Sequence, residues 1–523
     1  MKRIAQWGAV VLLAVVMGGG TVAAIAASDD TTGTNVACAT ATIPDRTHTV
    51  GVDGTAIDTI TDSGTSVSSC TTQTYDIPTS TETQTVTGPS TSTSSTSSQT
   101  TTSSTSSAPA SGFTPLHVAG NKLQNAGGQD VRLIGTEESG SAYACEQNGG
   151  YGFTDTQTGN AMYGPMTSDD GGALPAKWPI NSFALGLNQD CWLGINGVPA
   201  KYSGQNYINF VKAEVTSMEA HDIYPVIYLS VGEPGSDTPN WSSTGNGNAP
   251  MPDADHVPLL WQEVANEFKS DPDVIFRLYE EPWPEFDGSV NAAWQCWSQG
   301  DVQFGTGSDN ALPSGWESSP GAQVGPTPTS SNQGCNPLES DANGHTYSAV
   351  GFQSLMNIVR GTGATNIVQV PGIAFANALS CTNAGDPTTC GFLQPGVKVT
   401  DPLATTNPGL GSQMMADTDN YPDTGQFVNS VTSVQDTYGP VERVMPIDMG
   451  EAGVVGNPAS FPLIQAFVGQ YDAWGQSYYL SQWETWANLI SDYNGTPDTA
   501  CGHAAPSGCW GSWIYDELTG ATL

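Results

Sequence analysis

Three glutamates stand at the ends of two apolar runs that have the composition of buried strands. The run "VIFRLYEEP" ends in Glu280 and Glu281, and "VMPIDMGEAG" ends in Glu451. A carboxyl group that stays protonated can deliver a proton to a leaving oxygen, and one that stays ionised can attack a carbon. Two such groups facing each other are what the hydrolysis of a glycosidic bond requires. The sequence must therefore fold so that the ends of these two runs meet.

The elements that could position these residues are strand-like runs that alternate with amphipathic stretches. Eight strands with intervening helices in a little over 400 residues predict an α/β fold, a (β/α)₈ TIM barrel, with polar residues at the strand ends forming the site. The competing open doubly wound sheet lacks a Gly-rich phosphate loop after its first strand. The strand candidates are "VRLIGTEE", "SFALGLN", "PVIYLSV", "VIFRLYEE", "NIVQVPGI", "SQMMADT", "VMPIDMGE" and "SYYLSQWE". The helix candidates are "NYINFVKAEVTSMEAHD", "VPLLWQEVANEFKSD", "SAVGFQSLMNIVRGTG" and "PLIQAFVGQYDAWG".

The front of the chain predicts export and a tether. Residues 1–26 have the Lys-Arg start, apolar run and small-residue end of a secretory signal peptide, and no later apolar run is long enough to span a bilayer. Residues 27–77 form a small Thr-rich segment, either a mini-domain or a stalk, and residues 78–112 a Ser/Thr-rich linker. The barrel domain is expected over residues 113–523, preceded by a short hairpin in "LHVAGNKLQNAGGQDVRLIG". We expect a secreted protein that could be held at the cell surface.

The charge balance excludes one class of partner. The 523 residues carry 51 acidic side chains and 13 lysines and arginines, which gives a formal charge of −38 at pH 7. Phosphate binding needs cationic patches, so a nucleic-acid partner is excluded. A shortage of cations suits a protein that works in acid, where carboxyl groups are neutral and lysines would repel one another.

Ten cysteines, an even number mostly in near pairs, fit structural disulfides in an exported protein. The six histidines do not cluster with them as a metal site would require, so we expect no metal and no cofactor. The expected pairs are Cys38–Cys70, Cys296–Cys335, Cys381–Cys390 and Cys501–Cys509, which leaves Cys145 and Cys191 to each other.

From Leu116 to about Gly495 the chain resembles glycoside hydrolase family five, the cellulase family. The similarity is carried in order by the hairpin, by "LNQDCWLGINGVPAKYSGQNY", by "MPDADHVPLLWQEVANEFKSDPDVIFRLYEEPWP" and by "PIDMGEAG". The family ends its fourth strand in Asn-Glu-Pro and its seventh in Gly-Glu. The resemblance therefore implies that Glu281 is the acid/base and Glu451 the nucleophile of a retaining mechanism.

Four polar positions depart from the family pattern. Glu280 replaces the Asn that binds the sugar 2-hydroxyl, Ala184 replaces an Arg, and Ser230 replaces a His. The family's His-x-Tyr corresponds to Asp419 and Tyr421. A second carboxyl beside the acid raises its pKa, and a protonated Glu280 could donate as the missing amide did. We therefore expect an acidic optimum if the chain is active.

Aromatic residues are expected to stack on the apolar faces of sugar rings. Trp483 matches the family's stacking residue on strand eight, with Trp486 as the alternative register, and Trp283 follows the Glu-Pro pair. The long Gly-, Pro- and Ser-rich segment between Pro284 and His345 holds Trp294, Trp297 and Trp316, which form either core or a sugar-binding wall.

The expected function is hydrolysis of a β-linked polysaccharide by a monomer. The default substrate implied by the resemblance is a β-1,4-glucan, with mannan or mixed-linkage glucan requiring changes only at the rim. Two other classes stay open. One is a non-catalytic carbohydrate-binding protein on a degenerate barrel, which would not need both glutamates. The other is an adhesive cell-surface stalk, indicated by the Thr-rich front.

Overall fold

The computed structural model describes residues 32–39, 69–76 and 113–520 of the chain, apart from fourteen internal stretches. These are 147–152, 155–160, 163–177, 233, 236–248, 285–289, 302–334, 336–338, 341–345, 423–426, 455–460, 484–488, 493–494 and 500–509. The predicted signal peptide and linker, Trp316, Trp486, and the cysteines 501 and 509 lie outside the described residues. The chain divides into two compact units, Met1–Ser106 and Ser107–Leu523.

In the first unit the structure describes one antiparallel pair of strands. Strand β1 (Thr32–Ala39) pairs with β2 (Ser69–Asp76), and the register sets Cys38 opposite Cys70. The predicted pairing of these two cysteines agrees with this register.

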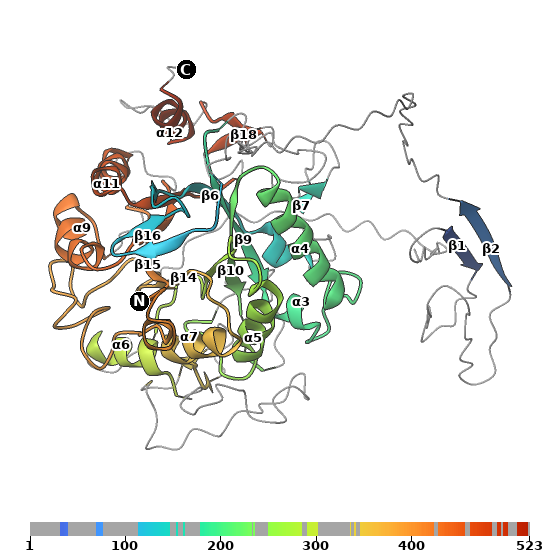
Figure 1. Ribbon diagram of the computed structural model, residues 1–523, viewed down its shortest axis with the longest axis horizontal. Coiled ribbons are helices and arrows are strands. Elements are labelled where there is room, and N and C mark those ends of the chain that lie inside the picture. The colour runs from blue at the N-terminus through green and yellow to red at the C-terminus, as the bar shows by residue number, and fades with distance from the viewer. Residues whose placement is uncertain are drawn as a thin grey trace, which may run out of the picture. The chain divides into compact units, whose positions relative to one another are not determined.

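The second unit is built on a closed barrel of eight parallel strands, in the order β6-β9-β10-β11-β14-β15-β16-β17 (Figure 1). All eight predicted runs supply a strand, so the (β/α)₈ prediction is confirmed. Because both faces of these strands are covered, their apolar runs are continuous rather than alternating. The strands are β6 (Ile134–Glu138), β9 (Ser182–Asn188), β10 (Tyr224–Val231), β11 (Ile275–Arg277), β14 (Val368–Pro371), β15 (Met414–Asn420), β16 (Ile447–Ala452) and β17 (Ser477–Leu480).

Helices lie around the outside of the barrel (Figure 1). Helix α5 shows why they pack there: it starts with Pro258 in its first turn, and its residues at helical spacing, Val257, Leu260, Trp261, Val264 and Phe268, are buried. The larger helices are α4 (Gln205–Glu219), α5 (Val257–Phe268), α6 (Val290–Gln299), α7 (Phe352–Gly361), α11 (Phe461–Trp474) and α12 (Trp510–Thr519). The shorter ones are α1 (Gly140–Ala144), α3 (Gln189–Leu193), α8 (Leu403–Thr406), α9 (Val431–Thr437) and α10 (Gly439–Glu442).

Small sheets complete the unit. The predicted hairpin before the barrel is a three-stranded sheet of β3 (His117–Ala119), β4 (Lys122–Gln124) and β5 (Asp130–Val131). Three further strand pairs are β7 (Phe153–Thr154) with β8 (Ala161–Met162), β12 (Glu339–Ser340) with β13 (Thr346–Tyr347), and β18 (Ile490–Asp492) with β19 (Thr496–Pro497).

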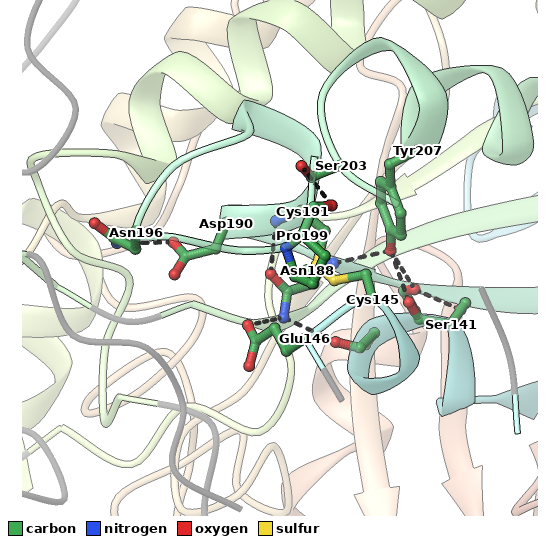
Figure 2. The surroundings of a disulfide bond; sticks show 12 residues. Ser141, Cys145, Glu146, Asn188, Asp190, Cys191, Asn196, Pro199, Ser203 and Tyr207 are labelled. Carbon is green, nitrogen blue, oxygen red and sulfur yellow. Dashed lines mark hydrogen bonds between the residues drawn. A yellow bond between two sulfur atoms is a disulfide. The ribbon is translucent and has the colours of Figure 1, made fainter. Parts of the chain in front are cut away.

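Three predicted disulfides are present among the described residues: Cys145–Cys191, Cys296–Cys335 and Cys381–Cys390. The first joins the segment after β6 to helix α3 after β9. Figure 2 shows Asn188 beside it, where the Asn188 side chain accepts from the Cys191 amide at 2.9 Å. The same side chain donates to the Ala142 carbonyl at 2.8 Å. The disulfide and Asn188 together fasten the segments that follow the first two barrel strands.

The segment between Pro284 and His345 is not an exposed wall where the structure describes it. Trp294 and Trp297 lie on helix α6 and are fully buried, packed edge to face against each other at 5.0 Å. Trp297 also packs against Phe352 and Phe392. For these two tryptophans the sugar-wall interpretation is wrong, because α6 turns them into the core. Over the described part of the chain, none of the helices has the length and apolar character needed to cross a bilayer.

Candidate active site

Three glutamates from three different strands converge at the carboxyl end of the barrel. Glu137 lies near the end of β6, Glu280 follows β11, and Glu451 lies in β16. One carboxylate oxygen of each lies within 4.8 Å of an oxygen of the other two. Glu137 is fully buried and Glu451 is 7% exposed, whereas Glu280 is partly exposed. The sequence predicted Glu281 and Glu451 as the catalytic pair, with Glu280 in the same cleft. Of the two adjacent glutamates it is Glu280 that joins Glu451 in this cluster, and the sequence did not single out Glu137.

Beneath this triad lies a buried arginine. Arg277, on β11, places its Nη1 3.9 Å from Glu137 Oε2 and its Nε 3.5 Å from Asp417 Oδ2. Its guanidinium also lies 5.3 Å from the ring centres of Tyr228 and Tyr479. As the sequence indicates, strand β9 has Ala184 and no arginine at this site, but strand β11 supplies a cation in the form of Arg277.

The acids around Arg277 outnumber it. The group comprises Glu137, Glu280, Glu281, Asp417, Asp419, Asp448 and Glu451. Burial raises the pKa of Glu137, and the charge of Glu451 raises it further while Arg277 lowers it. Burial and then Glu451 likewise raise the pKa of both Glu280 and Glu281. Carboxyl groups this close resist being ionised together, because the charge on one raises the pKa of its neighbours.

Glu281 stands in an unusual backbone conformation. Its φ is +44°, in the left-handed region of backbone conformation that residues other than glycine rarely adopt. The side chain is partly exposed, and the pKa of its carboxyl is raised by burial first, then by Glu451 and Asp417. Strained backbone of this kind collects at functional sites, where the surrounding structure holds it in place. Glu281 therefore combines a raised pKa with access to solvent, as a general acid requires.

Two glycines around Glu451 make room for its partners. A Cβ on Gly450 would lie 2.0 Å from Asp417 Oδ1, and one on Gly453 would lie 2.7 Å from the Tyr421 ring. The Tyr421 hydroxyl donates to Glu451 Oε2 and also contacts the Ser481 hydroxyl. The run "MGEAG" thus has glycines where Asp417 and Arg277 pack against Gly450 and the Tyr421 ring packs against Gly453. Tyr421 contacts the expected nucleophile, so its expected place at the site is supported by geometry.

The other residues that depart from the family pattern surround the same centre. Asp419 pairs in register with Glu451 on the neighbouring strand and is 2% exposed. Ser230, at the end of β10, is buried and hydrogen-bonds Tyr143, whose pKa burial raises. Asp419 and Ser230 are both almost fully buried, so neither side chain is open to a ligand in this structure.

The two predicted stacking residues lie in different settings. Trp483 is 4% exposed and packs edge to face against Trp178 at 5.6 Å, with its amide donating to the Glu137 carbonyl at 3.0 Å. Trp283 is partly exposed and stacks on Phe375, with ring centres 4.9 Å apart. Of the two, Trp283 is the aromatic with more of its surface open to a ligand.

The residues that sequence reasoning missed did leave signals. Glu137 ends the run "VRLIGTEE" in the same way that Glu280 ends its own strand. Arg277 is a charged residue inside an otherwise apolar strand, which is costly unless the charge is paired. Phe375 is the exception. It lies in a turn whose positive-φ residues are Ala374, Phe375 and Ala376, and without a glycine at these positions the sequence does not indicate such a turn.

Three clusters bring side chains of metal-binding type together within the described residues. They are Glu137, Glu280 and Glu451; Asp253, Asp255 and His256; and Glu219, Asp271 and Asp273. In the second cluster Asp253 also accepts from the His256 amide at 2.7 Å, a common arrangement at the start of a helix. Carboxyl groups can share protons in such clusters without an ion, and we assign no metal to them.

The fold and the convergent acids define a (β/α)₈ barrel with an acidic site at the carboxyl ends of its strands. No family model and no curated protein matches the chain. Among solved structures, it is similar to a β-glucanase from Saccharophagus degradans (14% identity, 73% of this chain and 89% of that one, TM-score 0.42). An endo-β-1,4-glucanase from Xanthomonas axonopodis pv. citri shows 16% identity over 74% and 99% of the two chains, with a TM-score of 0.41. The catalytic domain of an endoglucanase from Thermobifida fusca shows 12% identity over 78% and 97%, with a TM-score of 0.43.

Proposed function

We propose that this chain is a secreted, retaining glycoside hydrolase of the family-five type, acting on a β-linked glucan. The observation that carries the proposal is the convergence of Glu280 and Glu451 at the carboxyl end of the barrel, with Tyr421 donating to Glu451. Glu281, next to Glu280, is near enough for the charge of Glu451 to raise the pKa of its carboxyl. A β-1,4-glucan is the default substrate because the sequence resemblance is to cellulases.

The reaction proceeds in two displacements. Glu281 gives its proton to the glycosidic oxygen as the bond from that oxygen to the anomeric carbon breaks, and a Glu451 oxygen bonds to the same carbon. In the second step Glu281 takes a proton from water, the water oxygen attacks the anomeric carbon, and Glu451 leaves. The hydrogen bond from Tyr421 fixes the orientation of the Glu451 carboxylate between these steps.

Glu137 and Glu280 act on this pair through charge. Their oxygens lie within 4.8 Å of Glu451, so ionising all three together is unfavourable. The raised pKa values of Glu137 and Glu280 favour their protonated forms, and the Tyr421 hydroxyl donates to the Glu451 carboxylate. Glu280 in its neutral form can then donate a hydrogen bond to the sugar.

The first test is the release of sugar from β-1,4-glucan, mixed-linkage glucan and mannan between pH 3.5 and 7. Glu451→Gln should lower kcat by at least roughly 10³-fold with all substrates, since it removes the nucleophile. Glu281→Gln should lower kcat roughly 10²- to 10⁴-fold on polysaccharide. It should leave the first step unimpaired with a 2,4-dinitrophenyl glycoside, whose leaving group needs no proton. Glu214→Gln, a buried carboxyl on α4, is the matched control and should retain activity.

Three outcomes would contradict parts of the proposal. Equal losses for Glu280→Gln and Glu281→Gln in the glycosylation step with both leaving groups would remove the acid role from Glu281. A product of inverted anomeric configuration, followed by NMR, would exclude the double displacement. Binding of glucan without any hydrolysis by the native protein would favour the non-catalytic carbohydrate-binding alternative.

A further inference from the structure

A short helix brings a tyrosine to the acids of the site. Helix α1 follows β6, and its residue Tyr143 is partly exposed. Burial raises the pKa of the Tyr143 hydroxyl most, and the charges of Glu280, Glu451 and Glu281, in that order, raise it further. The interaction between charges weakens with distance, so the hydroxyl lies close to these three carboxyl groups. Glu280 is the one whose charge it meets most strongly.

Helix α1 is fastened on both sides of Tyr143. Before it, the Ser141 hydroxyl donates to the Gly186 carbonyl of β9 at 2.7 Å, and the Ser141 carbonyl accepts from the Tyr207 hydroxyl at 3.1 Å (Figure 2). After it, Cys145 ends the helix and forms the disulfide to helix α3. A helix of five residues is not stable by itself, so these bonds are what hold it. They fix the point from which the Tyr143 side chain projects.

The Tyr143 hydroxyl has a buried partner on another strand. Ser230, near the end of β10, is buried and hydrogen-bonds Tyr143. This bond lowers the pKa of Tyr143, as expected when the serine donates to the phenol oxygen. A phenol oxygen that accepts from Ser230 still carries a hydrogen to donate. Glu280 is at hand, because its amide donates at 2.9 Å to the carbonyl of Leu229, the residue before Ser230.

Groups on several elements face Glu280. After burial, the acids on neighbouring strands raise its pKa and therefore oppose its ionisation, whereas the charge of Arg277 favours it. Tyr143 and Tyr228 are the hydroxyl donors nearby, and of these two Tyr228 is fully buried. Among the described residues, the charged and titratable groups that face Glu280 are Glu451 on β16, Glu137 on β6, Asp419 on β15, Arg277 on β11, Tyr228 on β10, Tyr143 on α1 and the adjacent Glu281.

We propose that Tyr143 is a positioning residue for Glu280: its hydroxyl, held by Ser230, donates to the Glu280 carboxyl and directs that group toward the sugar. The inference rests on the proposed function, in which a neutral Glu280 donates to the substrate. A protonated carboxyl has one oxygen that donates and one that only accepts. When Tyr143 donates to the accepting oxygen, the oxygen that carries the hydrogen faces the site.

This hydrogen bond has a predictable effect on ionisation. It favours the charged form of Glu280 over the neutral form, because a hydrogen bond to a charged oxygen is the stronger one. Tyr143 therefore lowers the pKa of Glu280, against the burial and the acids that raise it. Tyr143→Phe removes the hydroxyl and keeps the ring, so the pKa of Glu280 should rise. If activity requires a neutral Glu280, the alkaline limb of the pH–rate profile should move to higher pH.

The experiment measures kcat/KM for cellopentaose against pH. Tyr143→Phe should move the alkaline limb up by roughly one pH unit and lower kcat/KM at the optimum roughly 3- to 10-fold. Ser230→Ala should move the limb in the same direction by less. In the Glu280→Asn background, Tyr143→Phe should move the limb no further, because asparagine does not titrate. Tyr224→Phe is the matched control and should change neither quantity, since its hydroxyl donates to the Thr114 carbonyl at 2.8 Å at the amino end of β10.

A purely structural Tyr143 would give another pattern. Its substitution by Phe would lower kcat/KM by one factor at every pH, or would move the limb equally in the native and Glu280→Asn backgrounds. Either result would overturn the proposal.

A second measurement does not depend on turnover. The infrared difference spectrum between the protein and its Glu280→Asn variant isolates the band of the protonated Glu280 carboxyl, and the loss of this band is followed as the pH rises. Tyr143→Phe should move the midpoint of that loss to higher pH. A raised midpoint in a protein that hydrolyses nothing means that the contact with Glu280 stands and the enzyme proposal fails. An unchanged or lowered midpoint excludes the contact, whatever the activity.

Discussion

A carboxyl group donates a proton or a hydrogen bond only while it is protonated, so each glutamate at this site depends on the charge of its neighbours. The pKa of Glu280 is raised by burial first, then by the charge of Glu451 and a hydrogen bond to it, and further by Glu137. If activity requires a neutral Glu280, its ionisation sets the alkaline limit of the pH–rate profile. Glu137 and Glu280 then affect that limit in opposite directions.

Glu280→Asn and Glu137→Gln should therefore shift the alkaline limb of the pH–rate profile in opposite directions. The asparagine donates at every pH, so the limb should move toward neutrality, up to the pKa of Glu281. Removal of the Glu137 charge lowers the pKa of Glu280, so that limb should move to lower pH. The measurement is kcat/KM against pH for the three proteins. Shifts in the same direction, or a native optimum near pH 7, would contradict this account of the paired glutamates.

At the scale of elements, the positions of the strands could be predicted, but the packing and partners of individual residues only in part. Eight apolar runs bounded by turn residues indicated eight strands because a barrel strand buried on both faces must be apolar along its length. The fate of Trp294 and Trp297 could not be predicted, since a Gly- and Pro-rich neighbourhood concealed helix α6. Arg277 stands inside an apolar strand because acids from neighbouring strands, such as Asp417 and Asp448, surround it. These contacts join residues far apart in the sequence, so they could not be predicted from it.

The amphipathic face of α4 was predicted, but it contains a buried acid. Glu214 is 5% exposed, and burial alone raises its pKa to about 7. The pKa of Glu214 in the folded protein lies above its value in the unfolded chain. The free energy that its burial costs the folded state is therefore absent in acid and grows as the pH rises from about 4.5 through 7. The penalty above that range is on the order of 3 kcal/mol, from about 1.4 kcal/mol for each pKa unit.

Glu214→Gln should therefore stabilise the barrel at pH 8 and not at pH 4. The expected gain is a melting temperature higher by a few degrees at the alkaline pH, measured by calorimetry. Because α4 lies outside the barrel mouth, the pH–rate profile of this variant should match that of the native protein. A gain of equal size at both pH values would mean that packing, rather than the charge, is responsible.

At the scale of the whole molecule, the acids of this chain are numerous relative to its cations and many are buried. Burial is the first cause of a raised pKa for Glu137, Glu280 and Glu281 in the site. The same holds away from it: the pKa of Glu219 rises to about 8 and that of Asp273 to about 6. The formal charge of −38 at neutral pH adds repulsion between the remaining carboxylates.

These shifts predict a protein that is most stable in acid. Below the ordinary carboxyl values of about 4, both folded and unfolded chains are protonated at these groups, and the shifts cost nothing. As the pH rises, the unfolded chain releases its protons first, so stability falls until the raised pKa values of about 6 to 8 are passed. Calorimetry should give a higher melting temperature at pH 4.5 than at pH 8. Salt at molar concentration screens the long-range repulsion between carboxylates but not the effect of burial. Part of the difference in melting temperature between the two pH values should therefore remain in molar salt. A melting temperature that is equal or higher at pH 8 would show that other groups compensate the buried acids.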